Sequence, residues 1–263
     1  MIGYDIRGSG EAAILFNHSG ASGQGWSEIF LEALAATFTV ITVDHRGTGY
    51  SSLGSDPFSL YDLAADGLAV LQKEGIDNAM VIGTSMGGAV AQEFALAYPE
   101  QVTALILLGT FAGMSHYVQA DKKVLEIVGN ILPQWDKISS VERWQRLLPT
   151  IYSPGFLEHN RELAMELELR GGRFTTAETI ARHGAAVGAF ESYQRLPTMT
   201  IPALIIHGTA DPSIPVENGK ILAGRISGSK YIELKGVGHL PAVEKPLEVA
   251  EQIFRFTKKT AWI

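Results

Sequence analysis

The fold is decided by residues 81–88, which read Val-Ile-Gly-Thr-Ser-Met-Gly-Gly. The apolar run 78–82 leads into them and predicts a strand, whereas residues 86–98 have the pattern of a helix. Ser85 therefore lies at a sharp strand-to-helix turn, in the pattern G-x-S-x-G, which holds the serine hydroxyl beyond the sheet edge. The glycines let the strand and the helix approach closely, because glycine has no Cβ. A helix that begins here also directs free N–H groups toward any anion formed beside Ser85.

Two interpretations of this stretch are open: a catalytic serine, or a tight turn capped by a serine. A serine nucleophile needs a histidine base and a carboxylate, and after such a turn they follow in the order serine, acid, histidine. The histidine must lie in a loop after a predicted core strand and must come later in the chain than the acid. Of the seven histidines, only His239 meets both conditions. Asp211 follows the strand 203–206, whereas the strand 104–108 has no carboxylate close behind it. Taken alone, each residue has an ordinary structural explanation: Asp211 can begin an Asp-Pro turn, and His239 can be a structural loop histidine. Together and in this order they predict a triad of Ser85, Asp211 and His239.

The remaining pattern predicts an α/β fold. Continuous apolar runs alternate with helical ones, which is typical of a mainly parallel, doubly wound sheet with helices on both faces. Active sites in such sheets lie at the carboxyl ends of the strands, so Ser85, the 17–23 loop and the 44–51 loop are expected on one rim. Strands are predicted near 2–6 at a sheet edge and at 12–16, 38–43, 79–82, 104–108, 203–206 and 230–234, with helices at 26–36, 60–73, 86–98, 216–226 and 247–258.

The strand pattern stops between residues 113 and 195. Candidate helices there cover 118–131, 141–151, 155–170 and 177–193. Ser139 with Glu142, and Thr175 with Glu178, have the spacing of a capping box at two helix starts. A helical block inserted directly after a strand end would cover the rim. We therefore expect a core of residues 1–112 and 196–263, with a helical cap of residues 113–195 inserted after the strand 104–108.

An oxyanion hole is expected from two backbone N–H groups. One is that of Met86, which follows the nucleophile, and the other comes from the loop after the strand 12–16. Gly20 is the preferred donor there, with Ser19 and Ala21 as the neighbouring alternatives in register. His116 stands where the cap begins and is a candidate for substrate contact or, alternatively, an exposed histidine at a helix start. Aromatic residues at helical spacing usually pack the cap onto the core, so one or two are assigned to the pocket. The predicted pocket residues are His18, Ser19, His116, Trp135 and Trp144.

Composition narrows the class of protein. The 263 residues are 46% hydrophobic and 19% charged, as in ordinary globular proteins. A net charge of −7 argues against nucleic acid or an anionic membrane as partner, since both require a basic surface. The absence of cysteine excludes disulfides and thiolate metal sites and is compatible with a reducing compartment. With Asp5 near the start and no apolar run of membrane-spanning length, a cytoplasmic protein is expected. No metal is predicted.

Taken together, these residues resemble the α/β-hydrolase fold family over about residues 4–256. The likeness is to the branch of small carboxylesterases, cofactor-free haloperoxidases that act as perhydrolases, and enol-lactone hydrolases. It implies that the 44–51 loop is structural and that the residue after the first His-Gly pair supplies an oxyanion N–H. Ser19 stands where the family usually has glycine. Serine at the turn differs from the aspartate of the dehalogenase and epoxide hydrolase branches. The segments that carry the resemblance are His18-Ser19-Gly20, Asp44 to Ser51, Gly83 to Gly88, His207 to Asp211, and Gly238 to Pro241 with Glu244 and Pro246 behind.

Three functional hypotheses follow. The first is a serine hydrolase that cleaves a small carboxylic ester or lactone through an acyl-enzyme on Ser85, with no cofactor and a small molecule as its partner. The second keeps the fold and changes the bond, as a C–C hydrolase of ring-cleavage dienoates or a perhydrolase. The third is a ligand-binding signalling protein that retains the triad but turns over slowly.

Overall fold

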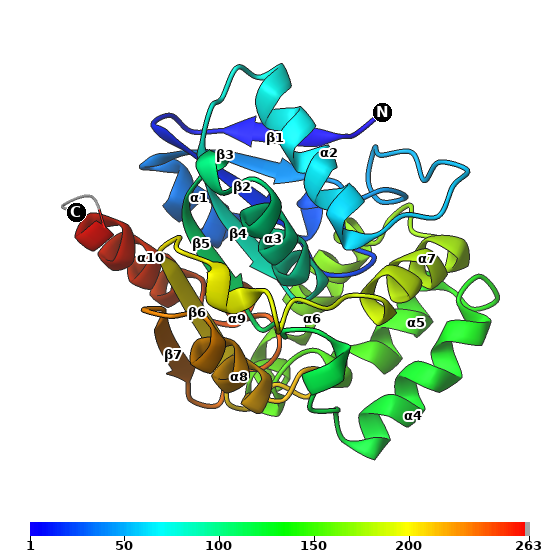
Figure 1. The fold of residues 1–263 in the computed structure, drawn as a ribbon. Helices are drawn as coiled ribbons and strands as arrows, with labels where there is room; N and C mark the ends of the chain where they lie inside the picture. Colours follow the sequence, from blue (N-terminus) through cyan, green and yellow to red (C-terminus); the bar gives the residue numbers. More distant parts are fainter. Residues whose placement is uncertain (261–263) are drawn as a thin grey trace.

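A computed structural model describes residues 1–260 of the chain (Figure 1). Within this range, seven strands form one sheet in the order β1-β3-β2-β4-β5-β6-β7. The pair β1 and β3 is antiparallel, and each other neighbouring pair is parallel. The predicted α/β class and mainly parallel sheet are confirmed. The strands are β1 (Tyr4–Arg7), β2 (Glu11–Phe16), β3 (Phe38–Val43), β4 (Ala79–Thr84), β5 (Val102–Leu108), β6 (Ala203–Gly208) and β7 (Lys230–Leu234).

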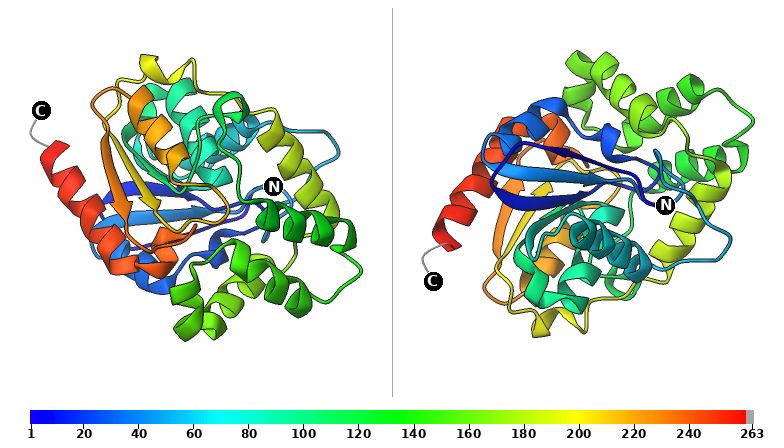
Figure 2. Two further views of the ribbon diagram at one scale, coloured as in Figure 1. Left: turned by 90° about the horizontal axis from the view of Figure 1, so that it is seen from below. Right: turned by 90° about the horizontal axis from the view of Figure 1, so that it is seen from above.

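Helices cover both faces of this sheet (Figure 2). Successive strand residues point to opposite faces, so Ile14 packs in one apolar cluster with residues of α2, α3 and α8, whereas Leu15 packs in another with residues of α1 and α10. Burial on both faces explains why the parallel strands are continuously apolar. The helices of the core are α1 (Glu28–Ala35), α2 (Leu60–Lys73), α3 (Met86–Ala97), α8 (Glu217–Arg225), α9 (Pro241–Glu244) and α10 (Pro246–Thr260), with 3₁₀ turns η1 (Gly23–Gly25), η2 (Pro99–Gln101) and η6 (Leu196–Thr198).

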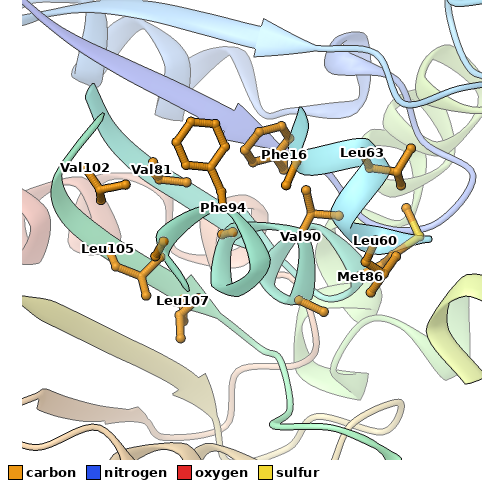
Figure 3. Close-up of a cluster of buried hydrophobic side chains, with 14 of the residues drawn as sticks. Phe16, Leu60, Leu63, Val81, Met86, Val90, Phe94, Val102, Leu105 and Leu107 are labelled. Carbon is orange, nitrogen blue, oxygen red and sulfur yellow. The ribbon is translucent and has the colours of Figure 1, made fainter. Parts of the chain in front are cut away.

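The α3 helix is held against the sheet by the larger of these clusters (Figure 3). Phe94 and Phe16 lie with ring centroids 6.2 Å apart, and both side chains are fully buried. Met86, the first residue of α3, is buried in the same cluster. The cluster therefore fixes the position of the helix start, which is where Ser85 lies.

Helices without strands fill the segment between β5 and β6, residues 113–195, which we call the cap. They lie beyond the carboxyl ends of the parallel strands, green to yellow-green in Figure 1. The two ends of the segment meet, because Gly113 pairs with Glu191 in an isolated antiparallel bridge. The cap contains α4 (Lys122–Ile131), α5 (Ser140–Leu147), α6 (Pro154–Gly171) and α7 (Ala177–Gly188), with 3₁₀ turns η3 (Met114–His116), η4 (Leu132–Gln134) and η5 (Leu148–Thr150).

The ends of the cap helices differ from the sequence prediction in several places. The second helix, predicted over 141–151, ends at Leu147 and continues as the 3₁₀ turn η5. The first helix begins at Lys122 rather than at 118, because Asp121 caps it by accepting a hydrogen bond from Lys123 N. The last ends at Gly188, since residues 190–192 pair back onto the start of the cap. Its N-cap is Thr176, which accepts from Thr179 N, and not Thr175 as predicted. By contrast, the predicted N-cap at Ser139 is confirmed.

The last three residues of the predicted core segment 196–263 lie outside the described residues. Among the helices of residues 1–260, none combines the length and the apolar character that crossing a membrane requires.

Candidate active site

Ser85 has a strained backbone. Its φ of 54° makes it the one non-glycine residue with positive φ in the described part of the chain. Such a conformation costs on the order of 1–3 kcal/mol and persists where surrounding contacts impose it. Here Ser85 N donates to Leu108 O at 3.0 Å, and Thr110 Oγ1 donates to Ser85 O at 2.7 Å. The end of β5 and the residues that follow it therefore hold both the N–H and the C=O of Ser85 in place.

The flanking glycines are required by space rather than by φ. A Cβ on Gly83 would lie 2.1 Å from Gly87 O, and a Cβ on Gly87 would lie 2.0 Å from Phe16 O. Neither distance is compatible with a side chain. The glycines of the G-x-S-x-G pattern thus permit the close crossing of β4, α3 and β2 that displays Ser85.

The Asp211 carboxylate meets the His239 imidazole. Asp211 Oδ2 lies 2.8 Å from His239 Nδ1, although the residues are 28 positions apart. The other carboxylate oxygen, Oδ1, accepts from Ser213 N at 2.9 Å and from Ile214 N at 2.8 Å. These contacts fix the plane of the carboxylate. They also orient the imidazole, because its Nδ1–H is directed at Oδ2 and its Nε2 is left as the proton acceptor.

His207 adds a second imidazole to Asp211. Its Nε2 lies 3.2 Å from Asp211 Oδ2 and 2.8 Å from Ile214 O, so this nitrogen carries the proton. Burial alone would raise the pKa of Asp211, but the nearby His239 and His207 outweigh it and hold the pKa below the usual value. The carboxylate therefore stays ionised at neutral pH.

Ser85 and His239 line one cavity of about 310 Å³. Its wall is mostly apolar, and among the described residues that form it there is no lysine, arginine, aspartate or glutamate. Larger cavities, of about 470 and 620 Å³, are formed by other residues of the cap, in one case together with core residues, and are lined by neither Ser85 nor His239. The small cavity is therefore the candidate active site. It is lined by Ser19, Ser85, Met86, Phe111, Met114, Tyr117, Gly184, Val187, Ser213, Ile214 and His239.

The backbone donors around this cavity require one correction. Met86 is the first residue of α3, so its N–H has no acceptor within the helix, and Met86 lines the cavity beside Ser85. Gly20 N, predicted as the second donor, instead donates to His183 Nδ1 at 3.1 Å. The prediction failed because the acceptor comes from the cap, 163 positions away. Of the two alternatives in register, Ser19 lines the cavity, whereas Ala21 does not and its N–H donates to His18 O.

Three of the predicted pocket residues lie elsewhere. Trp135 and Trp144 pack against each other inside the cap, with ring centroids 5.9 Å apart, because the turn after η4 brings Trp135 against the buried face of α5. His116 is exposed, and its ring stacks on that of Tyr193 with the ring centroids 3.5 Å apart. His18 does not line the cavity either. It is buried next to Ser19: its Nδ1 lies 3.1 Å from Ser19 O and its Nε2 lies 3.7 Å from Glu168 Oε2.

Sequence reasoning missed most of the cavity wall. Phe111, Met114 and Tyr117 follow β5, and Gly184 and Val187 belong to α7. The first three could have been found by extending the rule that sites lie beyond strand ends. The α7 residues had no such signal, since their spacing is that of any amphipathic helix.

The comparison with known proteins agrees with this arrangement. The family model described as "alpha/beta hydrolase fold" matches residues 12–246. The chain belongs to this family. RutD of Azorhizobium caulinodans, named as a carbamate hydrolase, is 28% identical over 255 residues, which cover 96% of this chain and 93% of RutD. Rhodomycin D methylesterase DnrP of Streptomyces peucetius is 30% identical over 257 residues, covering 87% of this chain and 85% of DnrP.

The fold is also that of solved α/β hydrolases. The enol-lactonase from Burkholderia xenovorans LB400 superposes with a TM-score of 0.85 at 22% identity, covering 98% of this chain and 96% of the enol-lactonase chain. The family and the named relatives thus support hydrolase activity for this chain.

Proposed function

We propose that this α/β hydrolase is a serine hydrolase that cleaves a small, uncharged carboxylic ester through an acyl-enzyme on Ser85. The observation that carries the proposal is the Asp211–His239 contact of 2.8 Å at a cavity that Ser85 also lines, with Ser85 on a strained turn. DnrP, a relative named as a methylesterase, supports an ester as the bond.

The steps follow from these positions. Ser85 Oγ attacks the ester carbonyl carbon while His239 Nε2 takes the hydroxyl proton, and the carbonyl oxygen becomes an oxyanion. Met86 N–H and Ser19 N–H donate to this oxyanion. His239 then returns its proton to the departing alkoxide, which leaves an acyl group on Ser85. Water then attacks the acyl carbon while His239 Nε2 takes its proton. His239 returns that proton to Ser85 Oγ as the acid leaves. Asp211 stabilises the imidazolium throughout, and no metal or organic cofactor takes part.

The first test is removal of the nucleophile. Ser85→Ala is expected to abolish turnover of p-nitrophenyl acetate and labelling by a fluorophosphonate probe, because it removes the hydroxyl that acts as the nucleophile. Ser55→Ala, at an exposed serine, serves as the control and is expected to match the wild type. Unchanged turnover in Ser85→Ala would refute the proposal.

The cavity wall gives a second test, on substrate charge. A free carboxylate placed in an apolar cavity without a cation would be buried unpaired, which is costly. We expect kcat/KM for mono-4-nitrophenyl succinate to be about tenfold or more below that for p-nitrophenyl butyrate, which has the same acyl length. Equal values would show that a charged acyl group is accommodated and would reopen the lactone and dienoate alternatives.

A further inference from the structure

The cap holds both backbone groups of Gly20, the residue that follows Ser19. Gly20 N donates to His183 Nδ1 at 3.1 Å, and Gly20 O accepts from Thr175 Oγ1 at 2.7 Å. Both side chains are buried, and both belong to the cap, more than 150 positions away. The 17–23 loop thus belongs to the core by sequence but is held by the cap.

His183 is itself held in one orientation. Its Nε2 lies 2.9 Å from Arg46 O, and since Nδ1 accepts from Gly20 N, the proton sits on Nε2 and is donated to that carbonyl. The ring meets His45 and Phe58 edge to face, with centroids 6.0 and 5.8 Å away. Burial lowers the pKa of His183 to about 4, which keeps the ring neutral and Nδ1 an acceptor.

These contacts fix the peptide plane between Ser19 and Gly20. On one side, Ser19 O lies 3.1 Å from His18 Nδ1; on the other, Gly20 N is bound by His183. Gly20 has φ of 77°, and a Cβ on it would lie 2.6 Å from Ile180 Cδ1, so the cap also closes over this residue. The Ser19 N–H belongs to the preceding peptide group and is joined to this plane through Ser19 Cα. A displacement of Gly20 would therefore move Ser19 Cα and, with it, the Ser19 N–H.

We propose that His183 and Thr175 are positioning residues, through which the cap aims the Ser19 N–H at the oxyanion. This inference rests on the proposed function, in which Ser19 N–H is an oxyanion donor. The cap then contributes to transition-state stabilisation, in addition to forming the cavity wall, without touching the reacting atoms.

Two substitutions of His183 separate the role of Nδ1 as acceptor for Gly20 N–H from the role of Nε2 as donor to Arg46 O. In His183→Asn, Oδ1 can replace Nδ1 as acceptor for Gly20 N–H. In His183→Gln, the amide nitrogen can replace Nε2 as donor to Arg46 O, but the acceptor for Gly20 is lost. We expect kcat for p-nitrophenyl acetate to fall about 10- to 100-fold in His183→Gln with little change in KM, because a displaced oxyanion donor weakens only the transition state. His183→Asn should recover most of this loss.

A transition-state analogue supplies the readout that a merely structural role would not move. Addition of Ser85 Oγ to a trifluoromethyl ketone forms a hemiketal whose oxygen occupies the oxyanion position. The inhibition constant of the ketone should rise in His183→Gln by the same factor as kcat falls, whereas that of the corresponding amide, a ground-state analogue, should not change. Thr175→Val should act in the same direction, and Thr175→Ser, which keeps the hydroxyl, should resemble the wild type.

The proposal is overturned if His183→Gln matches the wild type in kcat and ketone affinity, if His183→Asn is as impaired as His183→Gln, or if ketone and amide weaken equally. Hydrogen exchange over residues 17–23 distinguishes this failure from failure of the proposed function. If Ser85 of the wild type is not labelled by a fluorophosphonate, the proposed function is wrong. Faster exchange in His183→Gln than in His183→Asn would still support the conclusion that His183 holds the 17–23 loop in place. Equal exchange in the two variants would refute it.

Discussion

The decisive residues are placed by contacts that leave their side chains little freedom. The backbone of Ser85 is held at φ 54° by Leu108 and Thr110, so its strain is balanced within the core. Asp211 receives two backbone N–H groups on one oxygen and two imidazoles on the other. A carboxylate bound in this way acts by charge and orientation, because its pKa is kept low and its plane cannot rotate.

The residue-scale prediction concerns Asp211→Asn. An asparagine amide would repel the Nδ1–H that the carboxylate accepts and would favour the wrong tautomer of His239. We expect kcat to fall about 10⁴-fold, as for the equivalent change in another serine triad. Asp77→Asn, at an exposed carboxylate, is the matched control. A fall of less than tenfold, measured with p-nitrophenyl acetate, would show that His239 does not depend on Asp211.

At the scale of elements, α7 has two functions. Its buried face carries His183 toward the 17–23 loop, and Gly184 and Val187 line the cavity. The cap tryptophans have a different function, since Trp135 and Trp144 pack in the interior of the cap itself. The cavity is therefore shaped by one cap helix together with the segments that follow β2, β4, β5, β6 and β7.

Two glycines of α7 test this assignment. A Cβ on either Gly184 or Gly188 would meet no atom within 4 Å, so both positions accept a side chain, but only Gly184 lines the cavity. Gly184→Leu is expected to lower kcat/KM for p-nitrophenyl butyrate about tenfold or more relative to the acetate, because it fills the space of the acyl chain. Gly188→Leu should leave the ratio of the two substrates unchanged. The same ratio in both variants would place the acyl chain elsewhere.

For the whole molecule, the cap and the core are joined through buried neutral histidines. His45 stacks on Phe16, donates through Nε2 to Asn17 O, and meets His183 of the cap. Burial, followed by the neighbouring His183, lowers the pKa of His45 to about 3, and burial lowers that of His183 to about 4. An unfolded chain would protonate both near 6.5. Their contribution to stability is therefore complete above pH 6.5 and is lost as the pH falls toward 4.

This sign predicts an acid-sensitive fold. Between pH 7.5 and pH 5 each of these histidines should lower the free energy of unfolding by about 2 kcal/mol, because only the unfolded state takes up the proton. His45→Gln keeps the donor to Asn17 O and does not titrate, so its loss over the same interval should be smaller by that amount. The exposed His159→Gln should behave as the wild type. Urea unfolding at the two pH values measures the difference, and an identical pH dependence in His45→Gln would contradict the assignment.

The sequence by itself determined the strands, the strand-to-helix turn at Ser85, the order of acid and histidine, and the helical character of the cap. These features depend on neighbours in the chain: continuous apolar runs for the strands, helical spacing of apolar residues, glycine at a close crossing, and loops that follow strands. Only the tertiary structure decided that Gly20 N–H is taken by His183, that the two tryptophans belong to the cap interior, and that α7 lines the cavity. Each of these depends on contacts between segments far apart in the chain, and residue spacing along one segment contains no information about the partner that folding brings to it.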